Sequence, residues 1–463
     1  MSTKRTTETG STADRVAGKP DDTDRYEPTV GSAQHPPLVS PAVKNILPII
    51  IADGPEALIE LCGVNLLERL LRILQRLGFR RAIVFSETPQ IIELELTRRT
   101  WASEEIIVQL VSGAIGSVNA KVFLEQIPSE RFLIVPANIY CDRRLLAALC
   151  AKDSPAALVD SNPPQFARHL IQNPCGPALV TRDFLLACST TAAFFDQLKY
   201  KIENRLIDAV DAAATDDYIV RMRRHVRPLC FPAPRDRGLA ERIILDSAQN
   251  GTLDLPAYLH APIETALISV LCKTQITPNQ ITIAGLIIGF SATAAFATGH
   301  VGLGILAGLV FGLVDGLDGK QARVKVETTE RGKLEHQLDD LIENSWWAAI
   351  AFQLWRSGQF PNAFYFLALL VASLLLDEFA KHRVKIARGR LLDDVMPFDR
   401  AFRLIAARRN VYVWILACGF LLGAFPKSYA IICGWAAVSA AVHLARSIWL
   451  CNTQAPHVVS SRA

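Results

Sequence analysis

The chain has 463 residues, of which 50% are hydrophobic, with a mean hydropathy of +0.23 and a formal net charge of +4. It is more apolar than most soluble enzymes, and its small net charge does not indicate a nucleic-acid partner. The ten cysteines form no C-x-x-C pair, which argues against a disulfide framework or a zinc knuckle and favours reduced thiols facing the cytosol.

The two ends of the chain are polar. Residues 1–40 are rich in Thr, Ser, Pro and charge and show no apolar period, which predicts a disordered arm. This arm lacks the apolar core of a signal peptide, so we do not expect export of the N-terminus. Residues 452–463 are expected to form a short tail.

Residues 45–245 alternate strand-like and helix-like stretches. NILPIIIA and RRAIVFS predict buried strands, and VNLLERLLRILQRLG between them predicts an amphipathic helix that ends at Gly78. RFLIVPANI and AALVDS predict later strands. Strands alternating with helices predict an α/β domain with a mainly parallel sheet covered by helices on both faces.

From Gln280 onward, apolar stretches recur with short polar breaks, which predicts an all-α membrane domain with six transmembrane helices. Thr277 is expected to cap the first helix, with Pro278 in its first turn. A soluble helical bundle is the alternative. The predicted spans contain ITIAGLIIGFSATAAFA, VGLGILAGLVFGLV, GKLEHQLDDLIENSWWAAIAFQLW, NAFYFLALLVASLLL, VYVWILACGFLLGAF and residues 429–450.

Charge asymmetry favours the membrane interpretation. The connection from Lys381 to Arg409 carries nine Lys and Arg residues, whereas TGHVG, RSGQFP and PKS on the opposite side carry at most one basic residue each. This positive-inside pattern predicts a multi-pass protein of the inner (cytoplasmic) membrane with both termini in the cytoplasm. Asp377, next to Glu378 and near Lys381, is expected to form a surface ion pair.

Charged residues end the second predicted span and begin the third. Asp315 and Asp318 are three residues apart, and His336 and Asp340 are four apart, so each pair shares one helix face. The topology places the two pairs at the same depth. Hard oxygen ligands from two helices are what Mg²⁺ or Mn²⁺ requires, so a divalent-metal site is predicted here. Gly316 and Gly319 leave room for a phosphate, and Arg323 offers a planar fork for its oxygens.

This stretch resembles the signature of the CDP-alcohol phosphatidyltransferases, over about residues 257–451. Members of that family are six-helix membrane enzymes, often homodimers. They transfer a phospho-alcohol group from a CDP-linked donor to an acceptor hydroxyl and release CMP in phospholipid or polar-head-group biosynthesis. The spacing of the signature places its positions at Asp315, Asp318, Gly319, Ala322, Arg323, Gly332, His336 and Asp340.

The resemblance implies a role for each matched residue. Asp340 would be the catalytic base that deprotonates the acceptor hydroxyl. Arg383 and Lys385 in the basic connection would bind either a phosphate of the acceptor or anionic lipid. The implied metal ligands are Asp315, Asp318, His336 and Asp340, and the implied substrate-binding residues are Gly316, Gly319, Ala322, Arg323 and Gly332.

One position departs from the family, because His336 stands where the third aspartate is expected. An imidazole removes one negative charge and favours Mn²⁺ or Zn²⁺ over Mg²⁺. Glu335 and Asp339 are about 100° away on an ideal helix, from His336 and from Asp340 respectively, and are expected to point elsewhere. A catalytically silent protein that acts in binding or assembly therefore stays open as an alternative. A transporter is a further alternative, although the spans show no internal repeat.

The order of elements in residues 45–245 resembles a sugar-nucleotidyltransferase domain. Where such enzymes have a glycine-rich loop and a lysine, ADGPEALIELCG offers Asp53 and Gly54 and no lysine. Asn138 stands at the position of a metal-binding aspartate, with Asp142 nearby, and Asp236 is a displaced candidate for the second one. We therefore expect a degenerate nucleotide site. The pairing of the two domains resembles bifunctional inositol-phosphate cytidylyltransferase and di-inositol-phosphate phosphate synthase proteins.

Overall fold

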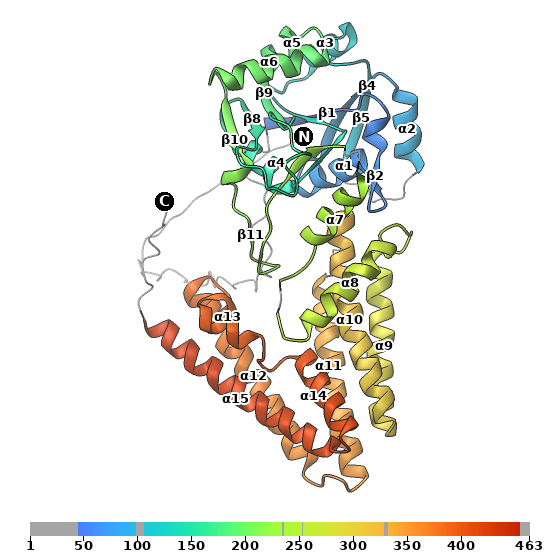
Figure 1. Cartoon of the computed structure of the whole chain (residues 1–463), viewed down its shortest axis with the longest axis vertical. Helices are drawn as coiled ribbons and strands as arrows, with labels where there is room; N and C mark the ends of the chain where they lie inside the picture. Colours follow the sequence, from blue (N-terminus) through green and yellow to red (C-terminus); the bar gives the residue numbers. More distant parts are fainter. Residues whose placement is uncertain (1–44, 99–105, 234–235, 252, 328–331, 454–463) are drawn as a thin grey trace, which may run out of the picture. The chain divides into compact units, whose positions relative to one another are not determined.

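The computed structural model describes residues 45–98, 106–233, 236–251, 253–327 and 332–453. The predicted arm, residues 1–40, and residues 454–463 of the predicted tail lie outside these ranges. Figure 1 shows the strands in the first half of the described chain and the long helices in the second half. The predicted change from an α/β region to a helical region is therefore confirmed.

The first half is built on a seven-stranded sheet with the order β10-β8-β9-β6-β1-β4-β5. Its strands pair in parallel, except that β9 is antiparallel to both β6 and β8, so the predicted mainly parallel sheet is confirmed. Three two-stranded ladders join β2 to β3, β7 to β13 and β11 to β12. The strands are β1 (Ile46–Ile51), β2 (Glu60–Leu61), β3 (Val64–Asn65), β4 (Arg81–Ser86), β5 (Ile107–Ser112), β6 (Arg131–Pro136), β7 (Ile139–Cys141), β8 (Ala156–Val159), β9 (Ala178–Thr181), β10 (Asp208–Asp211), β11 (Tyr218–Ile219), β12 (Arg224–His225) and β13 (Cys230–Pro232).

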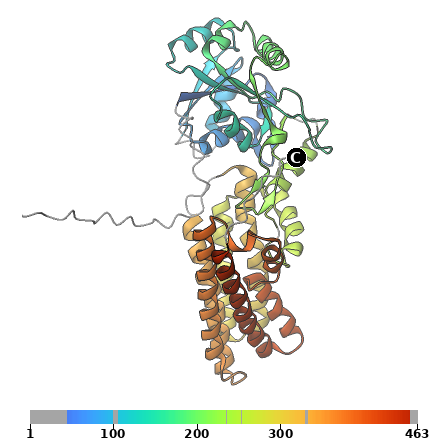
Figure 2. The ribbon, with the colours of Figure 1, turned by 90° about the vertical axis from the view of Figure 1, so that its left-hand side faces the viewer.

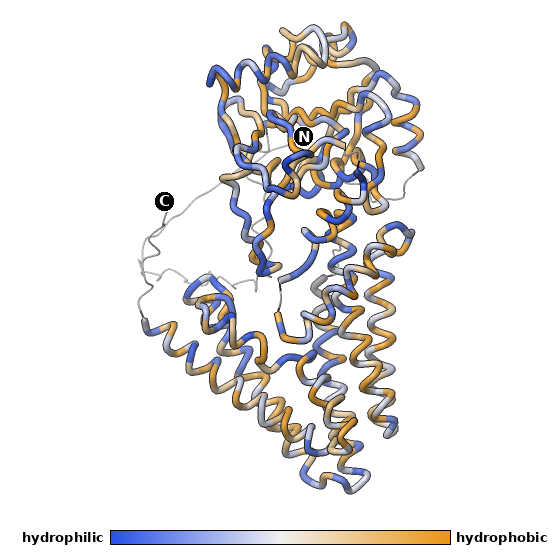
Figure 3. Tube along the Cα trace, viewed as in Figure 1, coloured by the Kyte–Doolittle hydropathy of each residue, from blue (hydrophilic) through white to orange (hydrophobic). Residues whose placement is uncertain are grey.

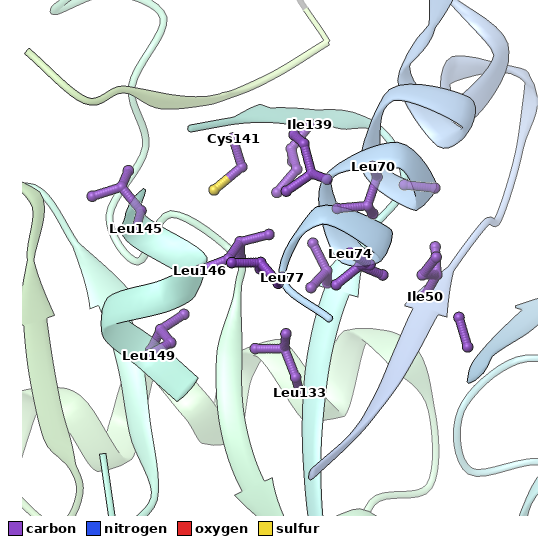
Figure 4. Close-up of a cluster of buried hydrophobic side chains, with 14 of the residues drawn as sticks. Ile50, Leu70, Leu74, Leu77, Leu133, Ile139, Cys141, Leu145, Leu146 and Leu149 are labelled. Atoms are coloured by element: carbon purple, nitrogen blue, oxygen red, sulfur yellow. The ribbon is translucent and has the colours of Figure 1, made fainter. Parts of the chain in front are cut away.

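Alternation along the strands gives this sheet two apolar faces. Ile50 and Leu133 point into a core shared with α1 and α4, which Figure 4 shows in close-up. Ile49 and Phe132 point to the opposite face, which is covered by α3, α5 and α6. Helices on both faces are thus confirmed. The helices are α1 (Leu66–Arg76), α2 (Pro89–Arg98), α3 (Val118–Gln126), α4 (Arg143–Cys150), α5 (Arg182–Ala187), α6 (Thr191–Glu203) and α7 (Arg237–Ser247), with short 3-10 turns at Pro55–Leu58 and Ala212–Ala214.

The second half consists of helices that lie alongside one another (Figure 2). The side chain of Thr277 caps α9 through the backbone N–H of Gln280, and Pro278 begins the helix, as predicted. The basic connection is partly helical, because α12 continues to Arg388 and α13 follows. The helices are α8 (Ala257–Leu271), α9 (Pro278–Thr298), α10 (Val301–Lys325), α11 (Gly332–Arg356), α12 (Ala363–Arg388), α13 (Pro397–Arg403), α14 (Arg409–Leu421) and α15 (Phe425–Asn452), with a 3-10 turn at Leu392–Asp394.

In the described part of the chain, four helices are long and apolar enough to cross a membrane: α9, α10, α12 and α15. Figure 3 shows hydrophobic residues along the length of α9 and α10. Five of the six predicted spans coincide with a helix, whereas the fifth, VYVWILACGFLLGAF, continues past the end of α14, which has only 13 residues. The helix of the third span, α11, starts with the polar stretch GKLEHQLDDLIEN. The structure thus supports four spans by length and composition.

Aromatic side chains fill the centre of this helical region. Trp346 and Trp347 of α11 are fully buried, and the Trp346 ring lies edge-on to Phe311 of α10 with 5.4 Å between the ring centroids. The indole N–H of Trp346 donates to the backbone oxygen of Gly289 on α9 at 2.8 Å. These contacts join α9, α10 and α11 next to the acidic ends of α10 and α11.

Candidate functional site

Asp315 and Asp318 both lie on α10, because the helix continues without a break to Lys325. The Asp318 carboxylate accepts a hydrogen bond at 2.7 Å from the hydroxyl of Thr282 on α9. The Asp315 carboxylate forms an ion pair at 2.5 Å with the guanidinium of Arg409, the first residue of α14. Thr282 and Arg409 were not identified from the sequence, and they orient the two aspartates from different helices.

The first half of α11 brings further carboxylates to the same place. Asp339 lies within electrostatic range of Asp315, Asp318 and Asp340, and Glu343 lies within range of Asp315 and Asp340. Asp340 itself is exposed, which leaves its carboxylate open to an incoming molecule. Asp339 of α11 therefore lies near the α10 aspartates, and Asp340 follows it on the same helix.

The structure differs from the sequence analysis at Asp339, which was expected to point elsewhere. Asp339 faces the α10 aspartates. Because residues four positions apart along a helix share a face, Asp339 and Glu343 form one row beside Asp340. His336 and Gly332 lie in α11, but their side-chain environment is outside the described part of the structure.

The two glycines of the acidic stretch make room for side chains of the protein itself. A methyl group at position 316 would lie 2.6 Å from a carboxylate oxygen of Glu264 on α8. A methyl group at position 319 would lie 3.1 Å from Nη1 of Arg323. The Nε–H of Arg323 donates to the backbone oxygen of Ala248 at 2.7 Å, which holds the guanidinium against α10 near Asp318. Ala322 is half-buried next to it.

A buried lysine follows the second glycine. Lys320 is fully buried, and its ammonium donates to the hydroxyl of Thr265 on α8 at 2.6 Å and to the side-chain oxygen of Gln249. The side-chain amide of Gln249 in turn donates to Glu264 at 3.4 Å. These contacts connect the end of α10 to α8. Lys320 and Glu264 could not be identified from the sequence, because Lys320 contacts residues that lie far away along the chain.

The acidic constellation, which consists of the carboxylates of Asp315, Asp318, Asp339, Asp340 and Glu343, has the chemistry of a divalent-cation site. Its donors are carboxylate oxygens, which Mg²⁺ and Mn²⁺ prefer, and a cation would offset the repulsion between neighbouring carboxylates. Among the described side chains, no three His, Cys, Asp or Glu residues converge closely enough to hold a metal ion. The described residues fit a metal in donor type and charge but not in their present spacing, and Asp315 is held by Arg409.

In the first half of the chain, each candidate metal ligand has another partner. The amide of Asn138 donates to the Glu56 carboxylate at 3.0 Å. Asp142 caps α4 and pairs with Arg144 at 2.9 Å. Asp236 caps α7 by accepting a hydrogen bond from the backbone N–H of Leu239 at 3.1 Å. These residues serve local structure and are not gathered into a metal site.

Asp53 is partly buried and lies near another carboxylate. Burial, followed by the nearby charge of Glu87, raises the pKa of Asp53 above its ordinary value of 3.8. One of its carboxylate oxygens accepts from the Thr191 hydroxyl at 3.3 Å. Gly54 has a φ of +89° at the start of the short helical turn Pro55–Leu58.

The basic residues proposed as phosphate or lipid contacts lie near the end of α12. Lys385 is exposed, and the half-buried Arg383 places its guanidinium 5.8 Å from the centre of the Phe379 ring. Both side chains are accessible to anionic groups, which is compatible with either expected role.

Residues 275–445 match the family model described as CDP-alcohol phosphatidyltransferase. A bifunctional IPC transferase and DIPP synthase of Aquifex aeolicus is 26% identical over 203 residues, covering 43% of this chain and 45% of the relative. A protein of the same name from Rubrobacter xylanophilus is 27% identical over 198 residues, covering 41% and 42%. The matched stretch spans less than half the length of these relatives.

Two solved structures resemble parts of the chain. The phosphatidylinositol phosphate synthase of Mycobacterium tuberculosis with bound CDP-DAG is 18% identical, with a TM-score of 0.33, and covers 45% of this chain and 100% of that one. The inositol-1-phosphate CTP transferase from T. maritima is 13% identical, with a TM-score of 0.30, and covers 42% and 95%. Both scores are below 0.5 and add nothing to the family match. The C-terminal region, which holds the four candidate membrane helices, therefore matches the CDP-alcohol phosphatidyltransferase family model.

Proposed function

We propose that the protein is an integral-membrane CDP-alcohol phosphotransferase that releases CMP while it transfers a phospho-alcohol group to an acceptor hydroxyl. The observation that carries this proposal is the approach of Asp339 on α11 to Asp315 and Asp318 on α10, beside Asp340 and within the region that matches the family. Carboxylates from two helices provide both the ligands and the base that such a reaction needs. The products would serve phospholipid or polar-head-group biosynthesis.

The described residues suggest a division of roles. Asp315 and Asp318 would hold the divalent metal, which when bound would neutralise charge on the diphosphate of the donor. Arg323 would bind phosphate oxygens beside Gly316, Gly319 and Ala322. The exposed Asp340 would accept the proton of the acceptor hydroxyl. Gly332 and His336 keep the roles that the signature implies, as a substrate contact and a metal ligand.

The wider organisation is part of this proposal. We assign residues 45–245 to a nucleotidyltransferase-like domain and residues 257–451 to the membrane domain, with α11 and α14 completing six spans. The positive-inside pattern places both termini in the cytoplasm and the protein in the inner membrane. We also propose that it forms homodimers.

The N-terminal domain is proposed to have lost nucleotide transfer. The hydrogen bond from Asn138 to Glu56 and the capping roles of Asp142 and Asp236 leave no carboxylate pair for a metal among the described side chains. The CDP-linked donor would then be made by another enzyme, and the domain would act in ligand binding or assembly.

One observation favours the alternative of a catalytically silent membrane protein. The Arg409 guanidinium already neutralises Asp315, and a histidine replaces the third aspartate of the signature. In that case the acidic constellation would be a structural ion-pair cluster, and the protein would act in binding or assembly.

Release of CMP distinguishes the two functions. Purified full-length protein would be mixed with CDP-linked lipid or polyol donors, acceptor alcohols and Mg²⁺, Mn²⁺ or Zn²⁺. We expect metal-dependent CMP release that falls at least about 100-fold in Asp340→Asn, because general-base catalysis contributes about that much. Glu378→Gln, an exposed carboxylate on α12, is the matched control. No release under any combination would favour the silent alternative.

The position of His336 gives a second test. His336→Asp restores the carboxylate of the signature and one negative charge, so Mg²⁺-dependent CMP release is expected to increase if the histidine is a defect. A decrease in CMP release would instead show that the histidine is an adapted ligand for Mn²⁺ or Zn²⁺.

A further inference from the structure

Arg409 provides an internal cation to the acidic constellation. Its guanidinium pairs with Asp315 at 2.5 Å and lies 4.6 Å from the centre of the Phe311 ring, one turn earlier on α10. The Arg409 side chain is only 14% exposed. The aromatic ring and the carboxylate together hold the guanidinium in one place.

The charges around Arg409 are mostly acidic. Besides Asp315, its electrostatic neighbours include Glu343 and Asp339 on α11. The other arginine of the stretch, Arg323, lies near Asp318 and is held by the backbone of Ala248. Arg409 therefore lies between the α10 and α11 acids, where the proposed cation would also have to bind.

We propose that Arg409 is a built-in counter-ion that competes with the divalent metal for Asp315. A carboxylate oxygen that accepts from a guanidinium cannot use the same lone pair to bind a metal. Metal binding would then require the Arg409–Asp315 pair to open, and the strength of that pair would set the affinity for the metal. This inference uses the location of the metal site in the proposed function, but it does not depend on catalysis.

A neighbouring residue provides a matched control. Arg408 precedes Arg409 and has the same charge, but it pairs with Asp393 at 2.9 Å and not with Asp315. Removing either positive charge has a similar long-range electrostatic effect on the metal site. Only the Arg409 substitution frees the Asp315 carboxylate from its ion pair. Arg409→Lys keeps the charge and loses the planar fork, so it separates charge from geometry.

The test is a titration of the purified full-length protein with Mn²⁺, in which the electron paramagnetic resonance signal of free Mn²⁺ measures binding. We expect Arg409→Gln to bind Mn²⁺ about tenfold more tightly than the wild type, since a partly buried ion pair no longer opposes the metal. Arg409→Lys should lie between the two, and Arg408→Gln should change binding much less.

Two results would overturn the inference. One is equal or weaker Mn²⁺ binding in both Arg409 variants, and the other is an equal increase in Arg408→Gln. If Arg409→Gln does not fold, the comparison of Arg409→Lys with the wild type decides. Absence of CMP release would count against the proposed function alone, because the Mn²⁺ comparison does not require turnover.

Discussion

The carboxylate of Asp377 on α12 and the imidazole of His443 on α15 are hydrogen-bonded to each other inside the helical region. Only 6% of Asp377 and 5% of His443 are exposed. The ammonium of Lys381 also pairs with Asp377, at 2.7 Å. The ion pair expected on the surface is therefore wrong in its location, because Asp377 is buried and joins two helices.

We predict that Asp377→Asn destabilises the protein by about 2 kcal/mol, because the buried imidazole of His443 loses its hydrogen bond to a carboxylate. Glu378→Gln is the control, since Glu378 is exposed and pairs with the same lysine at 2.9 Å. It should cost less than about 1 kcal/mol. Thermal unfolding in detergent measures both variants. Equal losses would contradict a special role for the buried contact between α12 and α15.

Gly319→Ala is predicted to reduce CMP release about tenfold with little loss of stability. The added methyl group would lie 3.1 Å from Nη1 of Arg323 and would push the guanidinium from its position near Asp318. Gly434→Ala on α15 is the control, because nothing lies within 4 Å of a methyl group there. An unchanged rate in Gly319→Ala would show that Arg323 need not hold this position.

Asn138→Asp is predicted to destabilise the N-terminal domain by about 1 kcal/mol at pH 7, because a hydrogen bond becomes a contact between two carboxylates. Glu56→Gln in the same background removes one of these charges and should restore stability. Chemical unfolding of both variants measures the effect. Recovery of CTP binding by Asn138→Asp would contradict the proposed loss of function in this domain.

Asp53→Asn is predicted to stabilise the protein at pH 7. Burial and Glu87 raise the pKa of Asp53 above 3.8, so the folded protein binds this proton more tightly than the unfolded chain. The contribution of Asp53 to stability is therefore fully present below pH 3.8 and is lost as the pH rises through the folded-state pKa.

Unfolding of the wild type and of Asp53→Asn between pH 4 and pH 7 checks this prediction. The advantage of the variant should grow as the pH rises. Asp153→Asn, which changes an exposed carboxylate, is the control. An advantage that shrinks with rising pH would contradict the assigned environment of Asp53.

Much of the fold could be predicted from the sequence, because the hydrophobic patterns of strands and helices are visible in short stretches of the chain. The continuous apolar runs III and AIVF marked β1 and β4 as buried strands, and the helical repeat of leucines marked α1. Thr277 and Pro278 marked the start of α9. The antiparallel strand β9 was not predicted, because strand direction depends on partners that are distant along the chain.

The candidate site was predicted less completely. Signature spacing identified Asp315, Asp318 and Asp340 as candidates, whereas the structure brings Asp339 to the α10 aspartates. Arg409 lies 94 residues from Asp315, and no local pattern in the basic connection distinguishes it from its neighbours. The buried contacts of Lys320 and Glu264 depend on how α8 packs against α10, which a single sequence does not encode in any short motif.

The most direct test of the account is an anomalous difference map from crystals of the full-length protein soaked in Mn²⁺. We predict a peak within about 2.5 Å of carboxylate oxygens from both α10 and α11, including Asp318 and Asp340. A peak bound by residues of one helix alone, or no peak in crystals of a protein that releases CMP, would contradict the shared metal site.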